Sequence, residues 1–525
     1  MDLKRQLDNN LEFRKHLFER GFLISDHELS CSLSKYPFFG NWNSAKYGDY
    51  YFYTYQTLDS YMKEANGIVL FLLGHAYNPF DMDDDENSIL EKLIKLKDDD
   101  FWRYEADLTG VYVMGKITAD GQITHWSDCA GMRISYYGFA NEHYYITSHV
   151  NIVASLTDLT ENNYVKELKS NHYFQLFGNI LPGDLSIYNE LKRTVPNHTY
   201  CNTGEVKRFY PIESIRECES EEDYQTVLIE SARILKNTLE LCAKKWKDSS
   251  VAISVTGGKD SGETLASANG HYDSFLYFSY ISKPEEEVDA KAAAEICRNL
   301  GLKHRLIPIP ENVCSDEEFE LFSELVYING GSIGYIKPNE IRKRIVLVQD
   351  KTIDIEIKSW VNETVRAYWY KKYNKKAFPA KPTGKYLATL YKVFIENRKL
   401  FKETSKVFDE YIDRYMNDDD TSVVNDWTTL WSWEFGFSAG EGQSLFAEHV
   451  LSFDITIPYN NRHLISLMLR PKISDRINDR LQKDIIEFNN PKQASLHIDV
   501  VNAAHTDKRA LMERAYLFIN THLPY

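Results

Sequence analysis

Residues 255–261, with the sequence VTGGKDS, have the side chains and spacing to bind a phosphate group. They follow a short apolar run, VAISV, that has the length and composition of a buried strand. At the carboxyl end of a strand, a glycine pair lets the backbone approach a phosphate, and the next helix start offers free N–H groups. Thr256 and Ser261 add hydroxyl donors, and Lys259 can face a phosphate or solvent. Asp260 would repel a phosphate, so we expect it to hold a bridging Mg²⁺.

Two other phosphate-binding motifs do not fit this segment. A P-loop requires G-x-x-x-x-G-K-[ST], but the chain reads GGKDSGET from Gly257, so that Glu263 stands where the lysine is needed. The dinucleotide pattern G-x-G-x-x-G is absent. A plain tight turn between a strand and a helix remains the structural alternative.

The elements around this segment predict a parallel, doubly wound sheet. Further strands are expected at residues 274–281 and 304–309, with a helix after Asp260 and another over residues 287–301. The latter has apolar residues every four positions and Gly301 at its carboxyl end. Strands that alternate with helices in this way favour parallel pairing.

The first 210 residues are predicted to be rich in antiparallel strands. Residues 67–78 form a strongly apolar run, and residues 107–126 and 133–149 have the alternation of hairpins with turns at residues 119–121 and 141–142. Residues 86–96 carry a helical stripe, which makes the acidic run at residues 81–86 a solvated helix start. The polar segment at residues 211–224 is expected to link two units.

Composition narrows the class of protein. The chain has 525 residues, which corresponds to two to four domains, and is 43% hydrophobic and 26% charged. Its 61 Lys and Arg against 77 Asp and Glu leave a net charge of −16, which disfavours nucleic acid and anionic membranes as partners. It has neither a long apolar span nor an apolar leader, and its seven cysteines lack C-x-x-C spacing. We therefore expect a cytoplasmic globular protein.

The segment Thr256–Ser261 resembles the S-G-G-x-D-S pyrophosphate loop of the N-type ATP pyrophosphatases. Within that class, the whole chain resembles the asparagine synthetase family, including the β-lactam synthetases and lasso-peptide cyclases. The weaker similarities are GHAYN at 74–78, WSDCAGMR at 126–133 followed by two tyrosines at 136–137, LPG at 181–183, RFY at 208–210 and IPY at 457–459.

The resemblance implies two domains. Residues 1–212 would form a glutaminase-like β-sandwich of the Ntn type, and residues 222–525 an ATP pyrophosphatase domain with a parallel sheet and a largely helical carboxy-terminal part. Glutamine-hydrolysing members carry a catalytic Cys directly after Met1, where this chain has Asp2. The amino-terminal domain is thus expected to be degenerate, so that the amine comes from ammonia or from a substrate.

The resemblance also implies an ATP and Mg²⁺ site. The residues expected at ATP are Val255, Thr256, Gly257, Gly258, Asp260, Ser261, Phe278 and Ser279. The segment IKSWVNE at residues 357–363 aligns with S-G-x-G-x-D-E, which puts Asn362 where a second metal-binding carboxylate is expected and retains Glu363. Two glycines of that pattern are replaced by Lys358 and Trp360, which suggests a reshaped acceptor pocket.

Two further positions are compared with the family pattern. Lys483 falls in the segment that holds the family's catalytic lysine, where it would stabilise developing negative charge; an exposed helical lysine is its structural alternative. Asn460-Asn461 replaces the family's Leu-Asp.

The expected function is an AMP-forming amide ligase that adenylates a carboxylate, releases pyrophosphate and passes the acyl group to an amine. The partners would be a small-molecule or peptide carboxylate and an amine, and a homodimer stays open. An intramolecular lactam or lasso-type cyclase and a nucleotide-binding scaffold without turnover are alternatives. An RNA-modifying ATP pyrophosphatase is disfavoured by the acidic charge.

Four weaker patterns have plainer interpretations. Gly330–Gly334 matches G-x-S-x-G, but the residues after it make a poor helix start, so a loop is favoured over a nucleophile elbow. The basic run at residues 371–385 is interpreted as a solvated loop, or as a collar for an anionic partner. Arg366 lies three positions after Glu363, so it can form an ion pair or contact substrate. The 15 histidines lack H-x-x-x-H spacing, which favours ordinary roles over metal binding.

Overall fold

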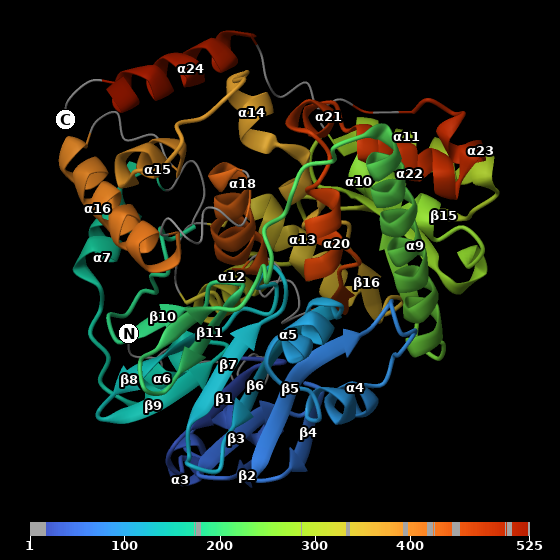
Figure 1. Cartoon of the computed structure of the whole chain (residues 1–525). Helices are drawn as coiled ribbons and strands as arrows, with labels where there is room; N and C mark the ends of the chain where they lie inside the picture. Colours follow the sequence, from blue (N-terminus) through green and yellow to red (C-terminus); the bar gives the residue numbers. More distant parts are fainter. Residues whose placement is uncertain are drawn as a thin grey trace.

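The computed structural model describes residues 17–172, 174, 180–284, 286–331, 336–391, 397–416, 424, 426–443, 452–498, 500 and 507–522. Within these ranges, antiparallel strands lie between residues 22 and 208 and parallel strands between residues 251 and 456. In Figure 1 the blue and teal antiparallel strands fill the lower part of the view, and the orange and red helices lie above them.

The amino-terminal half contains two six-stranded antiparallel sheets. The first has the order β10 (Leu191–Arg193), β8 (Tyr136–Ala140), β9 (His143–Thr147), β1 (Phe22–Ser25), β3 (Tyr50–Tyr55) and β2 (Trp42–Tyr47). The second has the order β12 (Val206–Arg208), β11 (His198–Cys201), β7 (Ile123–Ser127), β6 (Thr109–Ile117), β5 (Ile68–Tyr77) and β4 (Ser60–Ala65). The apolar run and both hairpins expected from the sequence are confirmed.

These sheets pack face to face as a sandwich. Phe52 of β3 meets Phe71 of β5 with ring centroids 5.2 Å apart, and Tyr137 of β8 meets Tyr200 of β11 at 4.5 Å. The pairing of β5 with β6 depends on glycine: Gly74 has φ +111°, and a side chain there would lie 2.2 Å from the Val111 carbonyl oxygen. The predicted β-sandwich is thus confirmed.

Helices cover the outer faces of the sandwich. On the β5 side lie α4 (Glu86–Leu93) and α5 (Asp98–Ala106). On the β1 side lie α6 (Val150–Leu156) and, from the second half of the chain, α12 (Asp316–Asn329) and α13 (Pro338–Gln349). The remaining amino-terminal elements are α3 (Ser30–Leu33), η1 (Pro37–Asn41) and α7 (Asn163–Ser170).

The second half is built on a five-stranded parallel sheet in the order β15 (His304–Pro308), β14 (Leu276–Ile281), β13 (Val251–Ser254), β16 (Ile355–Ile357) and β17 (Asp454–Thr456). The predicted parallel pairing is confirmed, and Gly301 has the expected left-handed φ of +82°. The chain moves from β13 outward to β15 and then returns to β16 on the other side of β13. The strand order therefore reverses between β13 and β16, whereas the sequence pointed to the β13–β14 side.

The helices of this half surround the sheet. The long α9 (Glu221–Lys245) begins at the cap residue Ser220, whose side chain accepts from the Asp223 N–H. The others are α10 (Lys259–Ser267), η2 (Tyr272–Ser274), α11 (Glu286–Leu300), η3 (Asn362–Arg366), α14 (Tyr368–Tyr373), α15 (Gly384–Tyr391), α16 (Arg398–Tyr415), α18 (Trp427–Trp431), η4 (Ser432–Glu441), α20 (Arg462–Met468), α21 (Ile473–Ile477), α22 (Arg480–Asn489), α23 (Pro491–Ala494) and α24 (Asp507–His522). The predicted helical carboxy-terminal part is confirmed, and none of the described helices is long and apolar enough to cross a membrane.

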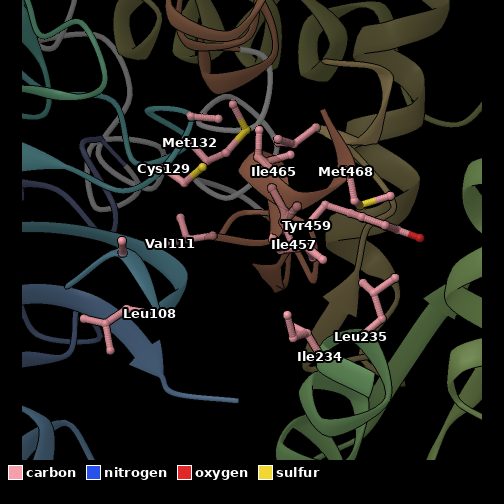
Figure 2. Packing of buried hydrophobic residues seen from close by; sticks show 14 of the residues in the cluster. Leu108, Val111, Cys129, Met132, Ile234, Leu235, Ile457, Tyr459, Ile465 and Met468 are labelled. Carbon is pink, nitrogen blue, oxygen red and sulfur yellow. The ribbon is translucent and has the colours of Figure 1, made fainter. Parts of the chain in front are cut away.

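A continuous apolar core joins the two halves. Figure 2 shows side chains of the amino-terminal half, such as Leu108 and Met132, facing Ile234 of α9 and Ile465 of α20. Beside this core, Arg462 is fully buried and donates to Glu105 Oε1 at 2.8 Å. Its other nitrogens donate to Asn197 and to the Ser127 carbonyl.

The two asparagines noted in the sequence also belong to this junction. Asn460 accepts from the Ala130 N–H at 2.9 Å and donates to the Gly110 carbonyl at 2.6 Å. Asn461 donates to the Asp107 carbonyl at 2.7 Å. Amides, which both donate and accept, suit this position because they meet backbone groups of both kinds.

Two sequence interpretations need correction. The acidic run is not wholly solvated, because Glu86 is buried and its carboxylate accepts from the Ala76 N–H and from Lys245 Nζ at 2.8 Å. The linker is not a simple polar spacer, because Ile215 and Cys218 are buried and the Cys218 N–H donates to the Arg470 carbonyl.

Candidate functional site

The segment after β13 lies against β14, as the sequence led us to expect. The Val255 N–H donates to the Phe278 carbonyl at 2.9 Å, and Ser279 Oγ donates to the Val255 carbonyl at 2.5 Å. Ser279 Oγ also lies 2.8 Å from His304 Nε2 on β15. Val255 and Phe278 are buried, so they position the loop at the carboxyl end of the sheet.

The hydroxyls of the loop hold its own turn. Ser261 Oγ accepts from the Thr256 N–H at 3.0 Å and lies 2.8 Å from Thr256 Oγ1. The Gly258 N–H donates to Thr256 Oγ1 at 3.1 Å. Thr256 is exposed and Gly258 partly so, while Ser261 is buried. A ligand can therefore approach the loop from the side of Thr256 and Gly258.

Gly257 faces protein. A side chain at this position would lie 2.3 Å from a methyl group of Val500, whose N–H donates to the Gly257 carbonyl at 3.0 Å. Asp289 of α11 lies nearby: burial raises the pKa of its carboxyl, and the Gly257 N–H opposes this rise. A carboxyl group is thus adjacent to one backbone amide of the loop.

The segment after β16 faces this loop. The two segments meet between β13 and β16, where the strand order reverses, and we call this place the switch point. Val361 has φ +77°, a strained conformation for a β-branched residue, and it leads into η3. Asn362 is buried: its amide nitrogen donates to Glu263 Oε2 at 2.7 Å, and its oxygen accepts from Gln482 Nε2 at 3.4 Å. The amide therefore bridges α10 and α22. Its role as a metal ligand stays a prediction.

Three buried carboxylate oxygens lie at this point without a hydrogen-bond partner among the described residues: Asp260 Oδ1, Glu263 Oε1 and Glu363 Oε2. Burial, the charge of Asp260 and that of Glu441 raise the pKa of Glu363 to about 8. Burial also raises the pKa of Asp260, although Arg366 opposes this effect. Burial raises the pKa of the neighbouring Glu263 well above its usual value.

Three cationic side chains complete the site. Arg366 Nη1 donates to Asp260 Oδ2 at 2.5 Å, and its Nε donates to Asp479 Oδ1 at 2.9 Å. Lys371 also donates to Asp479 Oδ1, and Lys259 Nζ lies 3.8 Å from Asp479 Oδ2. Burial opposes the charge of Asp479, but the hydrogen bonds from Arg366 and Lys371 outweigh it and lower its pKa. Asp479 thus lies within 3.8 Å of all three cations beside the loop.

Lys483 is not part of this group of cations. It is exposed on α22, and its Nζ donates to the Asn478 carbonyl at 2.9 Å. The catalytic role expected of it stays a prediction.

The basic run needs a correction. Lys371 and Lys372 belong to α14 rather than to a loop, and burial lowers the pKa of Lys371. Residues 332–334 of the G-x-S-x-G pattern lie outside the described residues. The element before Gly330 is the helix α12, whereas a nucleophile elbow requires a strand there. The helix that follows begins at Pro338, a position that favours proline.

Sequence reasoning missed the roles of Glu263, Lys371 and Asp479. Glu263 was noted only as the residue that excludes a P-loop, although its spacing of three from Asp260 places it on the same face of α10. Asp479 gave no local signal. Its φ of +53° and its contact with Arg366, more than a hundred residues away, become visible only in the folded chain.

The side chains at the switch point suit Mg²⁺. This ion is commonly bound by one or two carboxylates together with substrate phosphates and water. Asp260 Oδ1 is a buried oxygen without a partner among the described residues, next to a loop with the residues of a phosphate site. Asp260 is thus the side chain that would hold the ion.

No protein-family model matches the chain, and no curated protein matches it. One similar solved structure is glutamine phosphoribosylpyrophosphate (PRPP) amidotransferase from B. subtilis complexed with ADP and GMP, at 12% identity over 56% of this chain and 61% of that chain, with a TM-score of 0.23. Another carries the description "structure of the allosteric regulatory enzyme of purine biosynthesis", at 12% identity, the same coverage and a TM-score of 0.24. The match covers less than two thirds of either protein.

Proposed function

We propose that this chain is an ATP-dependent, AMP-forming amide ligase. The observation that carries the proposal is that Asp260, in the VTGGKDS loop, meets Arg366 and Glu363 of the segment after β16, between β13 and β16 where the strand order of the parallel sheet reverses. Open parallel sheets bind ligands in the crevice at such a reversal, outside the carboxyl ends of the strands.

The charges around the loop support a site for oxyanions. The carboxylate of Asp479 accepts from Arg366 and Lys371, and the Gly257 N–H opposes the rise in the pKa of the Asp289 carboxyl. Cationic side chains and loop amides of this kind bind phosphate oxygens in other sites. The β- and γ-phosphates of ATP would displace Asp479 from Lys259 and Lys371, while Gly258 and Thr256 contact the phosphate chain from the exposed side of the loop.

The reaction requires two steps. In the first, a substrate carboxylate attacks the α-phosphorus of ATP and pyrophosphate leaves. Mg²⁺, when bound, would neutralise phosphate charge and so ease that attack. Arg366 and Lys371 would hold the departing pyrophosphate in place.

In the second step, an amine attacks the acyl adenylate, AMP leaves, and the amine loses a proton. Glu363 is suited to accept that proton, because a base with a pKa of about 8 is well matched to a reaction near neutral pH. Its Oε2 is the atom without a partner among the described residues.

A nucleotide-binding scaffold without turnover is the second candidate. It is favoured by the exposed position of Lys483 and by the hydrogen bonds that engage the Asn362 amide on both sides. Such a protein would bind MgATP and yet release no pyrophosphate with any carboxylate.

Carboxylate-dependent exchange of labelled pyrophosphate into ATP tests the proposal. A panel of amino acids, small organic acids and peptides would be screened with the wild-type chain and with Asp260→Asn and Asp248→Asn. Asp248 is an exposed aspartate beyond α9 and serves as the matched control. The ligase predicts exchange with at least one acid, lost in Asp260→Asn and kept in Asp248→Asn. MgATP binding without exchange across the panel would favour the scaffold.

A further inference from the structure

Three side chains with metal-binding chemistry meet at the end of the β1–β9 ladder, in the amino-terminal sandwich. Ser25, the last residue of β1, pairs with Tyr145 of β9. Continuing this antiparallel register places Asp26 opposite Tyr144 and His27 opposite His143, which is the first residue of β9. Side chains at directly opposite positions share a face and lie close together.

The donor atoms of these side chains converge. Asp26 Oδ1 lies 2.8 Å from His143 Nδ1 and 3.1 Å from His27 Nδ1. The three donor atoms lie within 4.8 Å of one another, and all three residues are half-buried. The two imidazole rings stack with centroids 3.7 Å apart. In a tetrahedral zinc site with bonds of about 2.0–2.1 Å, neighbouring donors are about 3.3 Å apart. The two distances from Asp26 Oδ1 are thus close to the spacing in such a site, and the two histidine donor atoms lie within 4.8 Å of each other.

The surrounding groups hold the three side chains in this arrangement. Asp26 Oδ2 accepts from the Tyr144 N–H at 2.9 Å, which fixes the carboxylate and turns Oδ1 toward the histidines. The Oγ of buried Ser25 accepts from the His27 backbone N–H at 3.3 Å and lies 2.8 Å from His27 Nδ1, so a metal ion at this nitrogen would displace the serine hydroxyl from it. Asn141 and Glu142 have left-handed φ values of 50° and 68°, so a tight turn sets the start of β9 and the position of His143. Ordered groups behind the ligands are typical of metal sites.

We propose that Asp26, His27 and His143 form a site for a divalent transition metal of the zinc class, bound through Asp26 Oδ1 and the two Nδ1 atoms. Water completes the tetrahedron. Two imidazoles and one carboxylate suit Zn²⁺, Co²⁺ or Cu²⁺ rather than Mg²⁺, which prefers oxygen ligands alone. The bound ion joins the end of β1 to the start of β9, and so cross-links two neighbouring strands of the sandwich.

The alternative is a hydrogen-bonded triad in which each neutral histidine donates its Nδ1 proton to Asp26. It requires no metal. In that case the histidine substitutions weaken the fold to the same extent with and without zinc.

Zinc binding to the full-length, tag-free chain, treated with a chelator beforehand, decides between them. All variants would carry Cys31→Ser, because this exposed thiol could bind zinc by itself. Calorimetric titration is expected to give one Zn²⁺ per chain, with affinity reduced at least about tenfold in His27→Gln, His143→Gln and Asp26→Asn. His271→Gln, which removes a half-buried histidine on the other half of the chain, is expected to bind zinc as the parent does.

Two further readouts keep the proposal falsifiable if one variant folds poorly. Zinc should raise the melting temperature of the parent and of His271→Gln, but not that of Asp26→Asn. Co²⁺ should give the visible absorption of four-coordinate cobalt only where all three ligands are present. Equal zinc affinity in the parent and in Asp26→Asn, or a parent that binds no zinc at micromolar concentrations, would overturn the proposal.

Discussion

Arg366 Nη1 donates to Asp260 Oδ2 over 2.5 Å, and this bond joins the segment after β16 to the loop after β13. The same guanidinium donates through Nε and Nη2 to the two oxygens of Asp479, which precedes α22. One side chain therefore holds together three segments that are far apart in the sequence. We regard it as the group that keeps the switch point assembled.

Replacing Arg366 by Met is expected to destabilise the chain by about 3 kcal/mol, because Asp260 and Asp479 would lose their main partner in a largely buried place. Urea unfolding measures the change. The double variant R366M/D479N should recover part of the loss, since it leaves fewer charges unpaired. An R366M midpoint equal to that of the wild type would show that the ion pairs contribute nothing.

Asp260→Asn should separate function from stability. The substitution removes one of the charges that raise the pKa of Glu363, but it also removes the carboxylate that pairs with Arg366, so a modest fall in the melting temperature is expected while Asp479 still pairs with Arg366. Pyrophosphate release should fall about 100-fold or more, because the side chain that would hold Mg²⁺ loses its charge. A stable D260N variant with wild-type release would remove Asp260 from the site.

The fold was predictable from local patterns to a large extent. Patterns among neighbouring residues predicted three features that the structure contains: the hairpin after Gly110, the Asp-Gly turn at 120–121, and α11 with its four-residue apolar repeat. The covering of the β1-containing sheet by α12 and α13 was not predictable in this way, because it pairs faces more than a hundred residues apart.

The candidate site also contains residues that local sequence patterns predict and contacts between distant segments that such patterns do not predict. The VTGGKDS loop is one contiguous segment, and the sequence predicted a strand before it and a second strand, β14, beside it; the loop's role as a nucleotide site stays a prediction. The Asp479 contact with Lys371 and the Asp26 contact with His143 join distant segments, so spacing along the chain cannot show them. In the case of the histidines, a search for H-x-x-x-H spacing misses a cluster whose members face each other across two strands.

The pKa of Glu363 predicts a pH dependence of stability in the absence of Mg²⁺. The ordinary value is 4.5 and the folded value about 8, so below pH 4.5 the group is protonated in both states and carries no penalty. Between pH 4.5 and 8 the unfolded chain loses this proton while the folded chain keeps it, so the free energy of unfolding falls as the pH rises.

Glu363→Gln should remove the fall in the free energy of unfolding that Glu363 causes between pH 4.5 and 8. Urea unfolding of the wild type and the variant at pH 5, 6.5 and 8 is expected to show a growing advantage for E363Q as the pH rises. Under ligase conditions, the same variant should lose the amide-forming step while pyrophosphate exchange persists, because exchange precedes the proton transfer. Parallel stability curves for the two proteins would contradict the assigned pKa.

Asp479→Asn should tighten pyrophosphate binding. The carboxylate competes with phosphate for Lys371 and Arg366, so neutralising it is expected to lower the Kd for pyrophosphate about tenfold at low salt, a difference of about 1.4 kcal/mol. Asp475→Asn is the matched control, since Asp475 lies on the neighbouring α21 and its nearest cation is Arg480, 3.7 Å away. Weaker binding by D479N would mean that Asp479 supports the anion site rather than filling it.

The buried pair between the halves predicts a large structural effect away from the site. Arg462→Met leaves Glu105 charged and fully enclosed, and the expected cost is about 3–5 kcal/mol in urea unfolding. The exposed pair of Arg103 with Glu213 is the control, and Arg103→Met should change stability far less. Equal effects of the two substitutions would contradict the burial of Arg462.

A crystal structure of the chain with Mg²⁺ and a non-hydrolysable ATP analogue, obtained after binding has been demonstrated in solution, tests the central claim most directly. The account predicts the phosphates of the analogue at Thr256 and Gly258, the metal at Asp260 Oδ1, and Asp479 withdrawn from Lys371. An analogue that binds elsewhere on the molecule, with residues 256–261 and Asp479 unchanged, would contradict it.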